Sequence, residues 1–135
     1  MSDTLGFTAA LNVGFDQAVT RTKDALKVEG FGIISEIDMQ AAFKEKLGRD
    51  FRRFVILGAC NPPLAFQAIS TDPEVGLLLP CNVTVEAASD TASIVRIVDP
   101  VRLLEASTMA ALPEFEAIAK DAHDRLTRVA EALRT

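Results

Sequence analysis

The chain contains 135 residues, of which 49% are hydrophobic and 24% are charged. This composition excludes a disordered chain and fits one globular domain that folds without help from a disulfide or a metal ion. Nineteen acidic against fourteen basic side chains give a net charge of −5, which argues against nucleic-acid binding through a basic surface.

The sequence predicts a cytoplasmic protein that does not enter membranes. The first residues lack the basic start and the apolar stretch of a secretion signal. The longest unbroken apolar runs, such as 75–79, are far shorter than the roughly 20 residues that span a bilayer. In the reducing cytoplasm we expect Cys60 and Cys81, the only cysteines of the chain, to be free thiols.

The first half of the chain is predicted to alternate between strands and helices. Apolar residues at helical spacing, with capping residues beside them, mark the helices, and short apolar runs mark the strands. In chain order we expect a strand over 7–13, a helix over 15–28, a strand over 31–37, a helix over 39–47 and a strand over 51–59. The last of these strands has apolar residues on both faces, which indicates a central position in a sheet.

The second half is predicted to contain a hairpin and to end in helices. In chain order we expect a helix over 61–69, strands over 81–87 and 93–98 that form a hairpin, and helices over 101–106 and 113–133. The last helix is the longest and carries one continuous apolar stripe.

This order of elements, β-α-β-α-β-α-β-β-α-α, predicts an α+β fold. Alternation early in the chain is typical of parallel crossovers, whereas the late hairpin is antiparallel. We therefore expect a mixed sheet of about five strands packed against helices, in a single domain over residues 1–135.

Two short peptides share the most unusual pattern of the sequence. Gly58-Ala59-Cys60-Asn61-Pro62 and Leu79-Pro80-Cys81-Asn82-Val83 each place a Cys-Asn pair where a strand meets a turn. Cys60 lies just before a predicted helix N-terminus, where the helix dipole stabilises a thiolate. Such a sulfur suits a reactive thiol or a ligand to a soft metal or a haem iron.

With these two peptides the chain resembles the domain of unknown function 302 family of small bacterial and archaeal proteins. The resemblance covers about 14–133 and is most specific at 56–62 and 76–83. It implies a small α+β domain that forms a homodimer. It implies no reaction, because the activity of that family is not established.

We expect the site residues to be Cys60, Asn61, Pro62, Cys81 and Asn82. Pro62 would fix the loop, and Asn61 would cap the following helix, a structural role that is also its simplest interpretation. If the strands that carry the two cysteines are neighbours, the sulfurs could bridge reversibly or share a ligand, with Cα atoms within about 7 Å. The simplest interpretation of both thiols is core packing, because free Cys is among the most buried residue types.

The function favoured by these residues is a small-ligand-binding accessory module, with a metal or a haem among the candidate ligands. No catalytic residue is assigned, and the identity of any cofactor stays open. One alternative is a thiol-dependent redox or sulfur-handling enzyme, in which Cys60 attacks and Cys81 resolves. A second alternative is a dimeric interaction module without a small-molecule site. His123, the sole imidazole, lies at the margin of an apolar helix stripe, which favours packing over a Cys-His pair.

Overall fold

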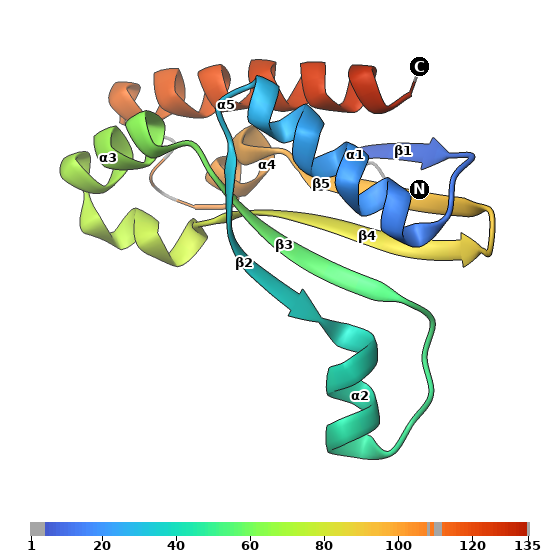
Figure 1. Cartoon of the computed structure of the whole chain (residues 1–135). Helices are drawn as coiled ribbons and strands as arrows, with labels where there is room; N and C mark the ends of the chain where they lie inside the picture. Colours follow the sequence, from blue (N-terminus) through green and yellow to red (C-terminus); the bar gives the residue numbers. More distant parts are fainter. Residues whose placement is uncertain (1–4, 108, 110–111, 135) are drawn as a thin grey trace.

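The computed structural model describes residues 5–107, 109 and 112–134. Its elements follow the expected order, with one additional 3-10 helix, η2 (Figure 1). In chain order they are β1 (Gly6–Leu11), α1 (Phe15–Val28), β2 (Gly32–Asp38), α2 (Met39–Leu47), β3 (Phe54–Cys60), α3 (Pro62–Thr71), η2 (Pro73–Leu78), β4 (Cys81–Ser89), β5 (Ala92–Val98), α4 (Pro100–Glu105) and α5 (Pro113–Leu133).

The five strands form one sheet in the order β1-β5-β4-β3-β2, and all four pairings are antiparallel. The α+β class and the five strands are therefore confirmed, but the expectation of a mixed sheet is wrong. β1 and β2, which α1 connects, run in the same direction but lie at opposite edges, so they are not neighbours. β3 and β4 are neighbours, but α3 and η2 stay at one end of the sheet and return the chain in the opposite direction.

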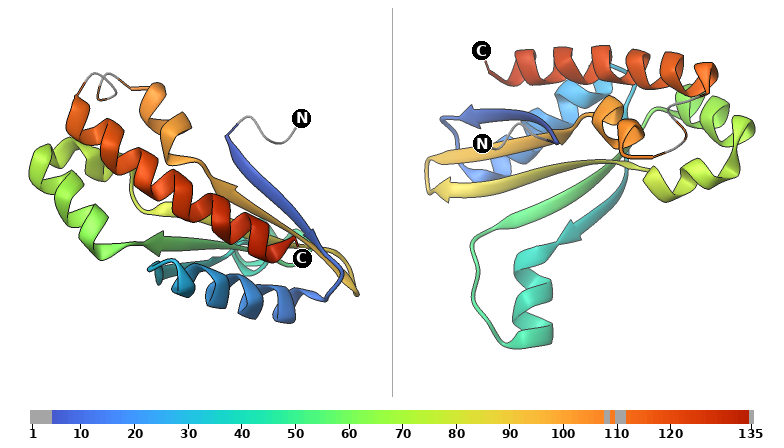
Figure 2. Two further views of the ribbon diagram at one scale, coloured as in Figure 1. Left: turned by 90° about the horizontal axis from the view of Figure 1, so that it is seen from above. Right: turned by 180° about the vertical axis from the view of Figure 1, so that it is seen from behind.

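One face of the sheet carries the main hydrophobic core. Helices α1 and α5 cover this face, as the view from above shows (Figure 2). Leu57 of β3 and Val83 of β4 point toward Leu26 of α1 and Leu126 of α5, and all four side chains are fully buried. β3 has a strand on each side, β4 and β2, so the expectation that it is not an edge strand is confirmed.

Local capping explains why the helices begin and end where the sequence predicts. Asp38 accepts a hydrogen bond from the backbone N–H of Ala41 at 3.0 Å and begins α2, and Asp99 does the same for Val101 in α4. Gly48 ends α2 in the left-handed conformation, with φ at 64°. These signals depend only on neighbouring residues, so the sequence reveals them directly.

The strand expected from residue 51 begins three positions later, at Phe54. Phe51 packs its ring against the ring of Phe43 on α2, with 5.2 Å between the ring centroids, instead of entering the ladder. Residues 39–53, named the α2 arm below, extend away from the main body (Figure 1). None of the nine residues of α2 is buried.

A second, smaller core lies beyond the end of the sheet where β3 stops and β4 starts. It joins α3, η2, α4 and the first turns of α5, and its buried members are Ala68, Val75, Leu104, Met109, Phe115 and Ala119. The two cores do not close completely on one another, and the candidate site lies between them.

Candidate functional site

The two Cys-Asn peptides lie side by side at one end of the sheet. In the β3–β4 ladder, Ala59 pairs with Cys81 and Gly58 pairs with Asn82. The strands that carry the cysteines are therefore neighbours, as the sequence-based hypothesis required. Ladder geometry puts the Cα atoms of Cys60 and Cys81 roughly 6 Å apart. Both cysteines are free in the structure.

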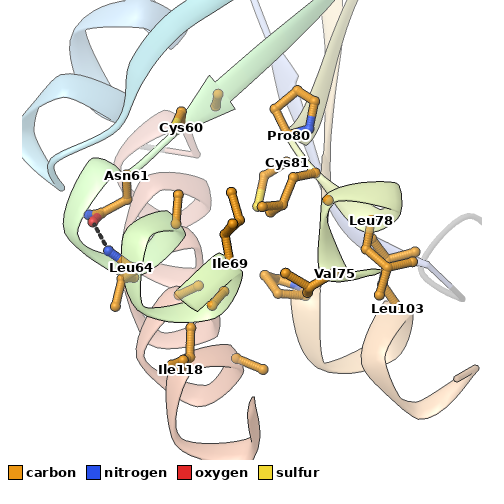
Figure 3. A pocket seen from close by; sticks show the side chains of 18 of the residues that line it. Cys60, Asn61, Leu64, Ile69, Val75, Leu78, Pro80, Cys81, Leu103 and Ile118 are labelled. Carbon is orange, nitrogen blue, oxygen red and sulfur yellow. Dashed lines mark hydrogen bonds between the residues drawn. The ribbon is translucent and has the colours of Figure 1, made fainter. Parts of the chain in front are cut away.

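A pocket of about 350 Å³ opens beside these strand ends (Figure 3). In Figure 3, Cys60 and Asn61 approach it from β3, and Pro80 and Cys81 approach it from the start of β4. Its remaining walls come from β2, α3, η2, α4 and α5. The side chains that line it and lie outside the two peptides include Phe31, Ile34, Leu64, Ile69, Val75, Leu78, Leu103, Leu104, Phe115 and Ile118.

The wall of the pocket is apolar and uncharged. Among the described residues that line it, none carries a charged side chain. The polar side chains in the wall are the amide of Asn61 and the thiols of Cys60 and Cys81. The chemistry of the pocket therefore favours uncharged ligands held mainly by apolar contact.

Asn61 holds the end of β3 to the start of α3. Its side-chain oxygen accepts a hydrogen bond from the backbone N–H of Leu64 at 3.2 Å, and its carbonyl accepts one from Ala65 at 2.9 Å. A Cβ atom on Gly30 would come within 2.9 Å of the Asn61 amide nitrogen, and Gly30 also has φ at 87°. Both facts require glycine there. The capping role expected for Asn61 is therefore present.

The two thiols differ in their surroundings. Cys81 is buried among the core residues, whereas Cys60 is half-buried. Burial, with a smaller contribution from Cys60, raises the pKa of the Cys81 thiol to about 11. Cys81 is thus a neutral thiol near pH 7, which makes it a poor nucleophile.

Pro62 and Asn82, the other two expected site residues, do not line this pocket. Pro62 is exposed in the first turn of α3. Asn82 alternates with Cys81 and therefore points to the opposite face of the sheet. There it lines a second depression of about 490 Å³, together with Thr84 and Arg96. The structure brings Cys60, Asn61 and Cys81 together and separates them from Asn82.

Gly58 belongs to the site in a way that the sequence analysis missed. A Cβ atom at this position would overlap the Ser35 hydroxyl and come within 2.8 Å of the Pro80 ring. Gly58 therefore allows β2, β3 and the Leu79–Pro80 segment to pack closely at the edge of the pocket. A glycine inside a predicted strand was the available signal for such a close approach.

His123 takes part in a different interaction. Its Nδ1 lies 2.9 Å from Oδ1 of the buried Asp99, and its ring lies 5.5 Å from that of Phe7. Among the described residues, the pocket lining does not include His123. The packing interpretation of His123 is therefore supported, and no Cys-His pair forms.

The uncovered face of the sheet carries a group of three charged side chains. The buried Glu86 on β4 accepts hydrogen bonds from Arg96 on β5 and from Arg52 before β3. Burial acts to raise the pKa of Glu86, but the hydrogen bonds and charges of the two arginines outweigh it, so that this pKa lies below its usual range. This ion-pair group ties β3, β4 and β5 together.

The residues described by the structure contain no group of three or more His, Cys, Asp or Glu side chains that could hold a metal ion. Among these same residues, every helix is too short or too polar to cross a membrane.

The fold and the pocket define a small α+β domain with an apolar cavity beside paired Cys-Asn peptides. A family model described as "Domain of unknown function DUF302" matches residues 7–133, so the chain belongs to this family. This match confirms the resemblance noted in the sequence.

A solved structure agrees with this assignment. The crystal structure of the uncharacterized conserved protein DUF302 from Bacillus stearothermophilus superposes with a TM-score of 0.82 and 28% sequence identity. The match covers 96% of this chain and 98% of that one. A comparison with curated proteins finds no similar sequence.

Proposed function

We propose that the protein is a cytoplasmic small-ligand-binding module whose site is the pocket between the two Cys-Asn peptides. The observation that carries the proposal is that Cys60, Asn61 and Cys81, from both peptides, line one apolar pocket of about 350 Å³. Pro62 supports this site by starting α3, and Asn82 supports it by its place in the ladder beside Gly58. The proposal assigns no catalytic residue.

The size of the pocket supports binding over simple core packing. A packed core contains few voids larger than a water molecule, whereas this space opens to the surface beside the two peptides. Its volume of about 350 Å³ lies within the range of known ligand pockets, which begins near 300 Å³.

The thiol-enzyme alternative has less support. A resolving thiol must ionise readily to act as a nucleophile, but burial raises the pKa of the Cys81 thiol to about 11. The half-buried Cys60 could still contact a ligand through its sulfur. We therefore assign the two thiols to the wall of the binding site.

Binding can be tested with the neutral fluorescent probe N-phenyl-1-naphthylamine, which brightens in apolar surroundings. We expect saturable binding to the full chain. Ala65 is half-buried in the pocket wall, and Ala65→Leu should reduce the pocket volume because it adds three carbons to the lining. Ala117→Leu, at an exposed position of α5 outside the lining, is the matched control.

Loss of probe binding in Ala65→Leu but not in Ala117→Leu supports the proposal, provided that both variants keep the wild-type circular dichroism spectrum. Equal binding to all three proteins would place the probe elsewhere and overturn the assignment of the site. Absence of any probe binding to the wild-type chain would overturn the proposed function.

We also propose that the protein is a homodimer in which the α2 arm packs on a second copy. Isolated helices shorter than about 12 residues are marginal in water, so they depend on tertiary packing. Helix α2 has nine residues and buries none of them within the described chain. Its exposed apolar surface, including Leu47, would be covered by a partner.

The dimer can be tested by sedimentation with two matched variants. Leu47 and Val28 are the last residues of α2 and α1, and their exposed fractions are 64% and 82%. Lysine is favourable at the last turn of either helix. We expect Leu47→Lys to convert the dimer to a monomer and Val28→Lys to leave it unchanged. A wild-type chain that sediments as a monomer at all accessible concentrations would overturn this second proposal.

A further inference from the structure

We propose that the ligand of this pocket is a neutral aliphatic molecule of medium chain length, whose uncharged polar end lies at the mouth beside Cys60 and Ile34. Medium-chain alcohols and aldehydes belong to this chemical class. The inference rests on the proposed function, because it specifies what the same pocket would bind.

The uncharged wall of the pocket favours a neutral ligand. An ionised group that leaves water needs a partner of opposite charge or several hydrogen bonds, because its desolvation is otherwise very unfavourable. The described lining residues contain neither a basic nor an acidic side chain. Among the described lining residues Asn61 carries the only amide; its oxygen accepts a hydrogen bond from Leu64, so its neutral NH2 group is the one side-chain amide donor for a ligand. A fatty acid anion or a phosphate ester would therefore meet no positive charge in this lining, even with its charged group at the mouth.

One end of the pocket is exposed to solvent and the other end is buried. Ile34, Ile69 and Gly76 line it and are exposed, whereas Leu104, Phe115 and Ala119 line it and are buried. The pocket therefore has its mouth at the exposed residues and its floor at the buried ones. Cys60 is half-buried beside the mouth, and the floor consists only of hydrocarbon. An aliphatic chain would point its methyl end to the floor and leave its polar end near Cys60.

The volume of the pocket favours a ligand of medium length. A water-sized group occupies about 30 Å³ in a liquid. The pocket of about 350 Å³ therefore accommodates about a dozen such groups. This capacity fits a chain of about eight to ten carbons with a small polar end.

The test compares chain length and charge in the full-length protein by isothermal titration calorimetry. The ligands are 1-butanol, 1-hexanol, 1-octanol and 1-decanol, with decanoate as the charged partner of decanol. Each added methylene group should tighten binding of the alcohols about fourfold. Decanoate should bind at least tenfold more weakly than decanol at neutral pH.

Two further variants test the position of the polar end. Ile34 lies at a β-bulge of β2 and is 64% exposed at the mouth, whereas Ile37 of the same strand is 49% exposed and does not line the pocket. Ile34→Lys should strengthen decanoate binding about tenfold through a new charge pair and leave the affinity for decanol within about threefold. Ile37→Lys should change neither affinity.

The possible results distinguish an error in the ligand class from an error in the proposed binding function. The ligand class would be wrong if decanoate bound as tightly as decanol, or if the affinity of the alcohols did not depend on chain length. Binding of N-phenyl-1-naphthylamine would in that case still support the pocket as the binding site. If Ile37→Lys strengthened decanoate binding as much as Ile34→Lys did, the position assigned to the mouth would be wrong. If neither the probe, the alcohols nor decanoate bind, the proposed function itself fails.

Discussion

Cys81 lies directly opposite Ala59 in the β3–β4 ladder, so Cys60 sits one position beyond it on the neighbouring strand. Because successive side chains alternate between the faces of a sheet, the two thiols leave their strands toward opposite faces. They nevertheless line the same pocket, which lies at the end of the sheet where β3 ends and β4 begins. This arrangement gives two thiols close to each other but in different surroundings.

The first prediction concerns the reactivity of these thiols. In the folded protein at about pH 8, N-ethylmaleimide should modify Cys60 well before Cys81. With its pKa raised to about 11, Cys81 has a thiolate fraction about a hundredfold below that of a thiol at the ordinary value of 9.0. Peptide mass spectrometry after timed quenching gives both rates. In denaturing guanidinium chloride the two rates should converge, and equal rates in the folded protein would contradict the burial of Cys81.

The second prediction concerns the cap that Asn61 provides for α3. Asn61→Ala removes the acceptor for the Leu64 N–H and should lower the free energy of unfolding by about 1 kcal/mol. Urea denaturation followed by circular dichroism measures this loss. Asn61→Ser retains an uncharged capping oxygen and should recover most of the stability. If Asn61→Ser is as unstable as Asn61→Ala, the cap is not the source of the effect.

The third prediction concerns the close approach at Gly58. Gly58→Ala should destabilise the protein by about 1 to 3 kcal/mol, because its Cβ atom would come within 2.8 Å of the Pro80 ring and overlap Ser35. Gly32→Ala is the matched control in the adjacent strand, where a Cβ atom meets nothing within 4 Å. Urea denaturation of the two variants should therefore give a large loss for the first and a small change for the second.

The fourth prediction concerns pH and Glu86. Its pKa in the folded protein lies below the ordinary value of 4.5, so its ionised form stabilises the fold above that pH. This contribution is lost as the pH falls through the lowered pKa of the folded state. At neutral pH, Glu86→Gln should cost about 1 to 3 kcal/mol, because the hydrogen bonds from Arg52 and Arg96 lose their charged acceptor.

Urea denaturation across a pH series tests this linkage. The difference in unfolding free energy between the wild type and Glu86→Gln should be constant above about pH 5 and shrink as the pH falls below about 4.5. Glu105→Gln, at an exposed position of α4, should show no such convergence with the wild type. A difference that stays the same down to acid pH would contradict the lowered pKa.

The sequence predicts the helices well because their boundaries depend on local chemistry. The capping residues Asp38, Asn61 and Asp99 each hydrogen-bond a backbone N–H two or three residues away. The direction of the strands is harder to predict because it depends on pairing across the chain. The alternation of strands and helices predicts parallel neighbours, whereas α3 and η2 return the chain to an antiparallel neighbour.

The candidate site likewise combines features that local sequence predicts with features that depend on distant contacts. The placement of Cys60 at the end of β3 and of Cys81 among core residues follows from local pattern. The opposite wall of the pocket, with Leu103 and Phe115, comes from helices more than twenty positions away along the chain, so no local pattern indicates it. Asn82 illustrates the limit of motif similarity, since its strand alternation separates it from the pocket despite the shared Cys-Asn pair.

The pairing of β1 with β5 sets an order for the assembly of the fold. Gly6 pairs with Val98, so the first strand of the chain reaches its partner only after all the other strands exist. Contacts between distant positions close late, because a long loop must be ordered before they form. Arg134 then donates hydrogen bonds to the Thr8 carbonyl at 2.8 and 3.1 Å and joins the end of α5 to β1. On a ribosome, β1 therefore emerges first and cannot pair until β5 has been made.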